Sequence, residues 1–303
     1  MSSYKVLVPL DGSRLAERSL NYLPAFKKLG ALEVELLGVI DEPNELLGPL
    51  AEEAIEREAN IVTTYIATVA EELGQHLGIE VESKVLGGEP DEVIVTYADR
   101  IKPNLLIIST HGRSGLQRWR LGSVADNVVH QATWPTLVIG PKAGTAHWPE
   151  AEMIEPFQSI LVPLDGSPLA EQALAPAQEY AQHFGSQVHL VRVVTLPVMA
   201  DGMGMTATYV PEVLSAIEEG GRDYLSKVAA QLALSGKTET EVLVGSPAIE
   251  LEEYAKKNNI DLIVMTSHGR GGIVRTTLGS VADRMLGTVA PVLIVRPTEV
   301  KTP

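Results

Sequence analysis

The 303-residue sequence contains no cysteine, which excludes disulfide bonds, thiol nucleophiles and thiolate metal sites. Aromatic residues are also scarce, at 5% of the chain, whereas hydrophobic residues make up 45%. No apolar run approaches the roughly 18 residues of a membrane-spanning helix, and the N-terminus lacks the charged-then-apolar pattern of a signal peptide. We therefore expect a globular, cytoplasmic protein without membrane contacts.

Positive charge is the minority charge in this chain. The sequence has 24 Lys and Arg residues against 39 Asp and Glu residues, which gives a formal net charge of −15. An acidic surface repels phosphate polymers, so we expect no nucleic-acid partner. This argument does not exclude a small anion held at one local site.

The most informative feature present is a duplication. Residues 6–13 (VLVPLDGS) return as residues 160–167 (ILVPLDGS), and the string LGSVAD occurs at residues 121–126 and again at 278–283. A period of about half the chain is too long for a solenoid, whose units contain roughly 20–50 residues. The duplication therefore predicts two similar domains.

Each half has the length of one ordinary domain with its own hydrophobic core. The stretch between the halves fits neither a helical nor a strand period, and it contains Gly144, Pro149 and Pro156. We predict domain 1 over residues 1–142, a linker over 143–157 and domain 2 over 158–303.

Short apolar runs alternate with helical patterns in both halves. The predicted strands are residues 5–9, 32–40, 81–86, 105–109 and 136–139, then 160–163, 188–194, 241–244, 262–266 and 292–295. The predicted helices of the first half are residues 15–29, 50–77, 90–101 and 124–130. This alternation predicts an α/β fold with a doubly wound, mainly parallel sheet in each domain. Pro24 and Pro176 should bend or divide the first helix of their domains.

A glycine-bearing loop between a strand and a helix is the strongest candidate for a binding site. In the first half, Gly112 follows the strand at residues 105–109, and nine residues separate it from Gly122 and Ser123. Glycine lets a phosphate approach the backbone, and the first turn of a helix offers free N–H groups and positive dipole charge. Simple helix capping is the alternative. The second half repeats the pattern with Gly269, Gly279 and Ser280.

Asp11 and Asp165 follow the first strand of each half. In a doubly wound sheet, a crevice opens there, between the strands on either side of the order reversal. An aspartate at that point can accept a hydrogen bond from an adenine amino group or a sugar hydroxyl. The alternative is an aspartate that only shapes the turn.

The same loops carry arginines, namely Arg113, Arg118 and Arg120 in the first half and Arg270 and Arg275 in the second. Guanidinium groups in an acidic chain suit a polyphosphate ligand. Salt bridges with nearby carboxylates are the alternative for each of them.

Catalytic and metal-binding patterns are missing from the sequence. His111 and His268 have no further ligands at metal-site spacing, so we predict a structural role for both and no metal site. The sequence has no Gly-x-x-x-x-Gly-Lys-Ser/Thr string, so it does not indicate an efficient P-loop ATPase.

These motifs resemble those of the universal stress protein family, in its tandem two-domain form. The shared features are a strand ending in Pro-x-Asp-Gly-Ser, a Ser/Thr-His-Gly-Arg-x-Gly loop and the string Leu-Gly-Ser-Val-Ala-Asp. The resemblance implies five-stranded sheets of order 3-2-1-4-5, as in adenine nucleotide α hydrolases. It also implies an ATP-binding sensor or regulator of the stress response, with or without Mg²⁺, and with at most weak ATPase activity.

The resemblance also assigns site residues. In domain 1 it places Asp11 and Val39 at adenine, and Gly112, Gly122 and Ser123 at the phosphates, with Ser109 near the ribose. In domain 2 the corresponding residues are Asp165, Val193, Thr266, Gly269, Gly279 and Ser280. We add Arg113 and Arg270 as candidate phosphate-binding residues on the charge argument above.

Ser109 and Thr266 depart from the family pattern, which has glycine at this position. A serine side chain is small and can turn away, whereas the β-branched threonine is stiffer and crowds the sugar. We therefore rank the first site above the second. The same departures support an alternative function, a nucleotide-free interaction scaffold.

Assembly follows from the apolar last strands of both halves. By resemblance, we expect the two halves to pair with each other through these strands, as a pseudo-two-fold pair. We also consider a homodimer of the whole chain.

Overall fold

The structure is a computed structural model that describes residues 3–40, 49–110, 122–143, 148, 157–195, 211–234, 238–267 and 278–296. Its contacts divide the chain into two compact units. Unit 1 contains the described residues up to Phe157 together with Leu286–Arg296. Unit 2 contains the described residues from Gln158 to Ser267 and the segment Leu278–Met285.

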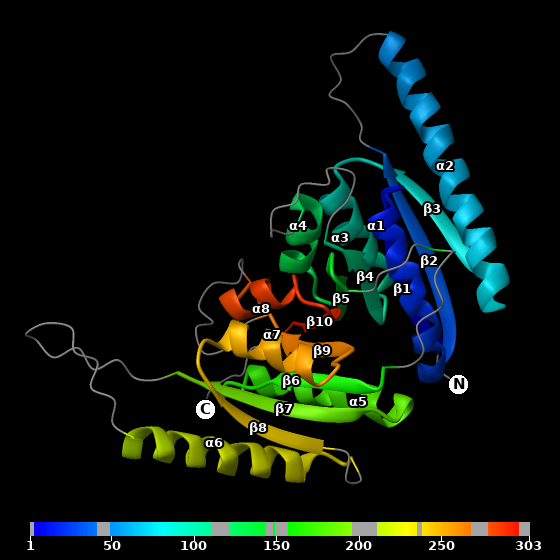
Figure 1. The fold of residues 1–303 in the computed structure, drawn as a ribbon. Helices are drawn as coiled ribbons and strands as arrows, with labels where there is room; N and C mark the ends of the chain where they lie inside the picture. Colours follow the sequence, from blue (N-terminus) through cyan, green and yellow to red (C-terminus); the bar gives the residue numbers. More distant parts are fainter. Residues whose placement is uncertain are drawn as a thin grey trace, which may run out of the picture. The chain divides into compact units, whose positions relative to one another are not determined.

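Unit 1 is built on a parallel sheet whose strands follow the order β3-β2-β1-β4-β5 (Figure 1). Its strands are β1 (Ser3–Leu10), β2 (Ala31–Ile40), β3 (Val81–Gly87), β4 (Leu105–Ser109) and β5 (Thr136–Ile139). Its helices are α1 (Arg14–Glu17), the 3-10 helix η1 (Arg18–Leu29), α2 (Pro49–Leu77), α3 (Pro90–Ile101) and α4 (Ser123–Gln131). This arrangement confirms the predicted fold class and strand order.

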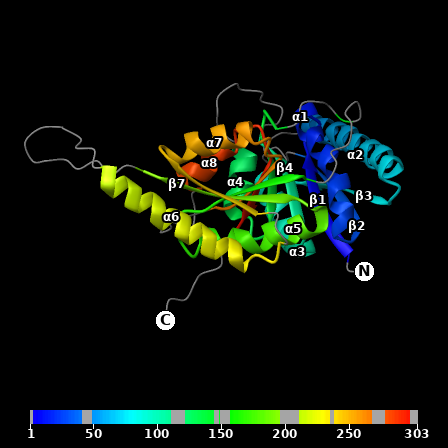
Figure 2. The same cartoon turned by 60° about the horizontal axis from the view of Figure 1, so that its bottom comes forward.

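Unit 2 repeats the architecture with a parallel sheet of order β8-β7-β6-β9. Its strands are β6 (Ser159–Pro163), β7 (Gln187–Val194), β8 (Thr238–Val244) and β9 (Leu262–Thr266). Its helices are the 3-10 helix η2 (Ala170–Ala173), α5 (Leu174–Phe184), α6 (Pro211–Gln231), α7 (Pro247–Lys257) and α8 (Ser280–Met285). Figure 1 and Figure 2 show the long helix α6 beside the sheet of unit 2, where it packs on β8 and β7.

The last strand of the chain, β10 (Val292–Val295), belongs by its contacts to unit 1. It pairs antiparallel with β5, with Leu293 opposite Leu137. Both strands are apolar and buried almost throughout, as expected of strands in the interior of a sheet. The first unit therefore contains a strand that lies in the second half of the sequence.

The first helix of each unit is divided, but in both units the division falls before the proline that was predicted to cause it. In unit 1 the α-helical turn gives way at Arg18 to a 3-10 helix that contains Pro24. In unit 2, α5 begins at Leu174, so Pro176 falls in its first turn, where a missing N–H costs no intrahelical hydrogen bond.

Among the described residues, no helix is both long and apolar enough to cross a membrane.

Gly38 lets α2 pack closely on β2. A Cβ atom added at Gly38 would lie 2.9 Å from side-chain carbons of both Val62 and Ile66, which are buried. We expect Gly38→Val to destabilise the protein by about 1–3 kcal/mol, the usual cost of overpacking a core. Denaturant unfolding followed by circular dichroism would measure this loss.

Gly220 offers a matched control inside α6. A Cβ atom there would meet nothing within 4 Å, so Gly220→Ala should stabilise the protein by about 0.5–1 kcal/mol through its helix propensity. Equal effects of the two substitutions would contradict the packing argument at Gly38.

One buried polar position differs in chemistry between the two units. In unit 1, the Tyr97 hydroxyl on α3 donates a hydrogen bond to Glu35 on β2, and Lys5 Nζ lies 3.9 Å from the other carboxylate oxygen of Glu35. Burial, followed by the neighbouring carboxylate, raises the pKa of Tyr97. The tyrosine therefore stays protonated and supplies a permanent donor to Glu35.

In unit 2 a histidine occupies the place of Glu35. Leu7 of β1 is in register with Glu35, and Leu161 of β6 is in register with His189. His189 is 4% exposed, and its Nδ1 lies 3.0 Å from the hydroxyl of Tyr254 on α7. Because Pro90 and Pro247 open α3 and α7 respectively, Tyr254 corresponds to Tyr97.

The remaining polar contacts of His189 come from β6 and β8. Its Nε2 lies 3.0 Å from the Ser159 hydroxyl, and its Nδ1 lies 3.4 Å from the carboxylate of Glu239. Burial lowers the pKa of His189, against the attraction of Glu239, Asp261 and Glu241. This position is therefore an acid in unit 1 and a base in unit 2.

Candidate functional site

The order of strands in unit 1 reverses between β1 and β4. These two strands pair in parallel, with Val6 opposite Leu105, and β2 and β5 lie on their outer sides. Crossover connections leave in opposite directions from such a pair, so a crevice forms at their carboxyl ends. Asp11 follows β1, and Ser109 ends β4.

A pocket of about 430 Å³ opens at this point. Ligand pockets typically have volumes of about 300–1,000 Å³. The five predicted residues of the first half that the structure describes all line this pocket, namely Asp11, Val39, Ser109, Gly122 and Ser123. The fold therefore brings residues that are up to 112 positions apart in the sequence (123 − 11) to one pocket.

Asp11 forms a turn as well as a wall of the pocket. Its Oδ1 accepts a hydrogen bond of 2.9 Å from the Ser13 N–H, and Gly12 between them has a φ of 79°. Ser13 in turn caps α1, because its Oγ accepts from the Ala16 N–H at 3.1 Å. Asp11 therefore shapes the turn through one carboxylate oxygen, as the alternative from the sequence predicted. The same residue also lines the pocket.

The same turn occurs in unit 2. Asp165 Oδ1 accepts from the Ser167 N–H at 2.9 Å, and Ser167 Oγ accepts from the Ala170 N–H at 3.1 Å. Gly166 has a φ of 84°. The duplicated sequence therefore encodes a duplicated strand end and helix start.

Gly122, the N-cap residue of α4, also lines the pocket. Its N–H donates to the Thr110 carbonyl at 2.7 Å, and its carbonyl accepts from the Asp126 N–H at 2.9 Å. Glycine has no side chain with which to cap the helix, so the amides of the first turn of α4 receive no cap from this residue. In unit 2, the Gly279 N–H donates to the Ser267 carbonyl at 2.9 Å.

Side chains from two helices and two strands also line the pocket of unit 1. They include Pro90 and Ile94 of α3, Glu58 of α2, Leu37 of β2 and Ile108 of β4. The apolar members give the pocket walls that a ring can pack against, while Glu58 adds a second carboxylate to the lining. No local motif marks these residues, since each resembles an ordinary position of its helix or strand.

The two candidate sites differ at the position that departs from the family pattern. Ser109 at the end of β4 is half-buried, whereas Thr266 at the end of β9 is only 5% exposed. The other described positions are buried to the same degree in both units. Asp165, Val193 and Gly279 are half-buried, like Asp11, Val39 and Gly122 in unit 1. Ser280 is exposed, like Ser123.

The loops themselves lie outside the described residues. This applies to the predicted residues Gly112, Arg113, Gly269 and Arg270, and to the other residues that the sequence singled out there, His111, Arg118, Arg120, His268 and Arg275. Within the described ranges, no group of three His, Asp or Glu side chains could hold a metal ion.

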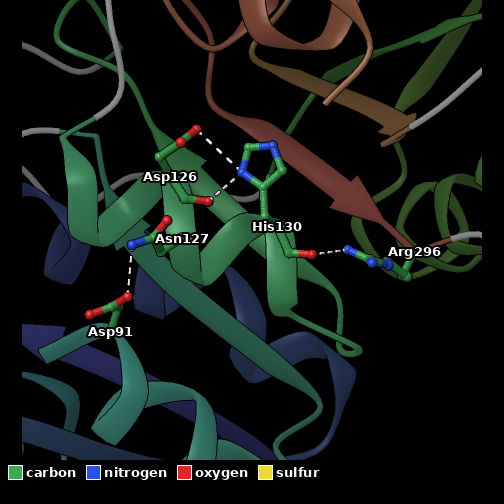
Figure 3. Close-up of polar contacts among 5 residues, drawn as sticks. All are labelled: Asp91, Asp126, Asn127, His130 and Arg296. Atoms are coloured by element: carbon green, nitrogen blue, oxygen red, sulfur yellow. Dashed lines mark hydrogen bonds and ion pairs between the residues drawn. The ribbon is translucent and has the colours of Figure 1, made fainter. Parts of the chain in front are cut away.

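α4 begins at this pocket. Its other end contacts Arg296, the residue after β10 (Figure 3). His130 near the end of α4 has its Nδ1 3.3 Å from the carboxylate of Asp126, one turn earlier. The Arg296 guanidinium donates to the main-chain carbonyl of His130. A cation at the carboxyl end of a helix interacts favourably with the helix dipole, so Arg296 stabilises α4 at the end opposite the pocket.

Comparison with known proteins decides the family. The sequence model of the Universal stress protein family matches residues 3–140 and 156–296. The chain belongs to the universal stress protein family. The two separate matches also agree with the tandem form that the duplicated motifs predicted.

Individual universal stress proteins show the same relationship. A full-length relative from Mycolicibacterium smegmatis is 27% identical over 307 residues, which cover 98% of each chain. The universal stress protein MJ0531 of Methanocaldococcus jannaschii is 36% identical over 143 residues, covering 46% of this chain and 82% of its own. The crystal structure of a universal stress protein from Archaeoglobus fulgidus has the same fold, with a TM-score of 0.67 over 97% of both chains at 22% identity.

Proposed function

We propose that this universal stress protein binds an adenine nucleotide in the pocket of unit 1 and acts as a nucleotide-dependent regulator of a stress response. The observation that carries the proposal is the convergence of Asp11, Val39, Ser109, Gly122 and Ser123 on one pocket at the reversal of strand order. These residues were assigned from sequence motifs that are far apart in the chain.

The pocket residues suit the parts of a nucleotide. Val39, Ile94 and Ile108 offer apolar contact to a purine ring, and Asp11 offers an acceptor to its amino group or to a sugar hydroxyl. Gly122 permits close approach of a phosphate to the start of α4, where amides and the helix dipole favour an anion. Ser123 adds a hydroxyl donor at the same point.

Chemistry on the nucleotide is a minor part of this proposal. No described residue forms a metal cluster, so Mg²⁺ would enter with the phosphates, whose negative charge it neutralises. We propose ATP as the ligand and at most slow hydrolysis, since the sequence provides no phosphate-binding lysine motif.

The second site would be the weaker of the two. Unit 2 repeats the Asp165 turn and the Gly279–Ser280 helix start, but its Thr266 is buried where unit 1 has a half-buried serine. We propose that unit 1 is filled at nucleotide concentrations that leave unit 2 empty. Cytoplasmic location, pairing of the two halves through their last strands, and a homodimer complete the proposed picture.

Nucleotide extraction and titration test the function directly. Purified protein is denatured, and the released small molecules are analysed by mass spectrometry. The stripped protein is then titrated with ATP by calorimetry. We expect saturable binding, and a rise in melting temperature with ATP concentration, because a ligand that binds only the folded state stabilises it. Absence of co-purified nucleotide together with no binding at millimolar ATP would exclude this function and favour the interaction scaffold.

A further inference from the structure

Two neighbouring helices form one side of the unit 1 pocket. α3 contributes Pro90 and Ile94, and α4 contributes Ser123, Val124 and Ala125. The two helices pack on each other. Their spacing therefore sets the width of the pocket on this side.

A hydrogen bond between side chains joins the two helices beside the pocket. Asn127 Nδ2 on α4 donates to Asp91 Oδ2 on α3 at 2.8 Å (Figure 3). Asp91 is the neighbour of Pro90, and Asn127 lies one turn after Ser123. Neither residue lines the pocket itself, so any influence of this pair on a ligand passes through the helices.

Unit 2 cannot form the same bond. α7 begins at Pro247 as α3 begins at Pro90, so Ala248 stands where unit 1 has Asp91. The repeated Gly-Ser-Val-Ala-Asp string aligns Asn127 with Arg284. An alanine side chain has no acceptor, and an arginine has no amide, so this connection between helices is confined to unit 1.

We propose that Asp91 and Asn127 are a positioning pair, which fixes the spacing of α3 and α4 and thereby raises the affinity of unit 1 for its nucleotide. The proposal rests on the proposed function for the identity of the ligand. The pair would be a second cause, besides Ser109, of the higher nucleotide affinity proposed for unit 1. It would hold α3 and α4 at one side of the pocket in place before the nucleotide binds. A binding site organised in advance loses less conformational entropy when its ligand binds.

Four variants separate the hydrogen bond from the charge. Asn127→Ala removes the donor, and Asn127→Asp places two carboxylates where the bond was. Asp91→Asn keeps an acceptor for Asn127 and serves as the matched control for the lost charge at the start of α3. The exchange variant Asp91→Asn with Asn127→Asp restores one hydrogen bond with donor and acceptor reversed.

The affinity for ATP, measured by calorimetry well below the melting temperature, is the first readout. We expect Asn127→Ala to weaken binding by about 2- to 10-fold, which corresponds to one hydrogen bond, and Asn127→Asp to weaken it further through like-charge repulsion. Asp91→Asn and the exchange variant should bind within about 2-fold of the original protein. Equal affinity in all variants would overturn the proposal, as would failure of the exchange variant to recover when Asp91→Asn alone binds normally.

Hydrogen exchange of the α4 amides in nucleotide-free protein is the second readout, and it does not depend on the ligand. Asn127→Asp should accelerate exchange in α4, and the exchange variant should restore it. If the original protein binds no ATP, the proposed function fails, and unchanged exchange in Asn127→Asp separately refutes the positioning role. Accelerated exchange that the exchange variant reverses supports the role of the pair even in that case.

Discussion

Gly122→Val is expected to weaken the binding of adenine nucleotide to unit 1 by about 100-fold, the upper end of the 1–3 kcal/mol that overpacking costs. Gly122 lines the pocket at the start of α4. Valine adds a branched side chain with restricted rotation to this wall, at the place where the proposed phosphates approach the backbone.

The backbone at Gly122 makes this substitution a clean test. Its φ of −60° and ψ of 150° lie in the extended region that valine adopts readily. The glycine is therefore not required by the conformation of the chain, and its advantage lies in the space that it leaves. Folding should survive the substitution while the pocket is obstructed.

ATP titration by calorimetry measures the loss, and thermal unfolding without ligand verifies the fold. Gly279→Val is the matched control, since Gly279 holds the same place in unit 2 and donates the same type of backbone hydrogen bond. Gly279→Val should leave the affinity of unit 1 unchanged. Unaltered binding by Gly122→Val would show that the nucleotide does not approach the start of α4.

Unit 2 is expected to lose stability as the pH falls from about 7.5 to 5.5, because of His189. Burial lowers the pKa of His189 below its usual 6.5 in the folded protein. As the pH decreases through 6.5, the unfolded chain therefore takes up a proton before the folded one does. The free energy of unfolding then falls, by at most about 1.4 kcal/mol per pH unit for this one group.

The ionisable groups around His189 determine the pH range in which its protonation can be measured through stability. Glu239 and Glu241 of β8 and Asp261 before β9 attract the proton, while Tyr254, whose pKa burial raises to about 12, stays neutral. Burial raises the pKa of Asp261, so this carboxyl gains its proton earlier in the folded state than in the unfolded one. That contribution has the opposite sign and belongs to more acidic solutions, because the usual pKa of the group is 3.8.

Denaturant unfolding at pH 7.5 and 5.5 would measure the effect of His189. His189→Gln removes the titrating group and should flatten the dependence of stability on pH. His183→Gln is the control, because His183 is exposed on α5 and its Nδ1 lies beside the Glu179 carbonyl of its own helix. An equal loss of stability in the original protein and in His189→Gln would assign the pH dependence to other groups.

Much of the fold could be predicted because its strands are short apolar runs bounded by residues that favour turns. The predicted bounds of β4, β5, β9 and β10 agree with the structure at every residue, as do those of α3. Elsewhere the ends differ by one to three residues, since a strand continues as long as its neighbour supplies hydrogen bonds. The sequence could not reveal the change to a 3-10 helix at Arg18, which no helical period distinguishes from an α-helix.

The site was predictable where its chemistry is local. Asp11, Gly122 and Ser123 belong to short strings with a fixed order, and duplication makes these strings conspicuous. Glu58 and Ile94 were not found, because their role depends on where long helices come to rest on the sheet. The replacement of Glu35 by His189 in unit 2 could not be predicted either. The tyrosines that contact these two residues are more than 60 residues away in the sequence.

Because β10 belongs to unit 1, this unit cannot finish folding until a late part of the chain has been synthesised. A ribosome adds residues 286–296 after the whole first half of the chain, yet they supply the strand beside β5 and the guanidinium that binds the end of α4. The N-terminal half therefore emerges with an unpaired apolar strand edge, a surface that invites aggregation until its partner arrives. A truncation that removes residues 286–296 should consequently destabilise unit 1, most of which was synthesised first.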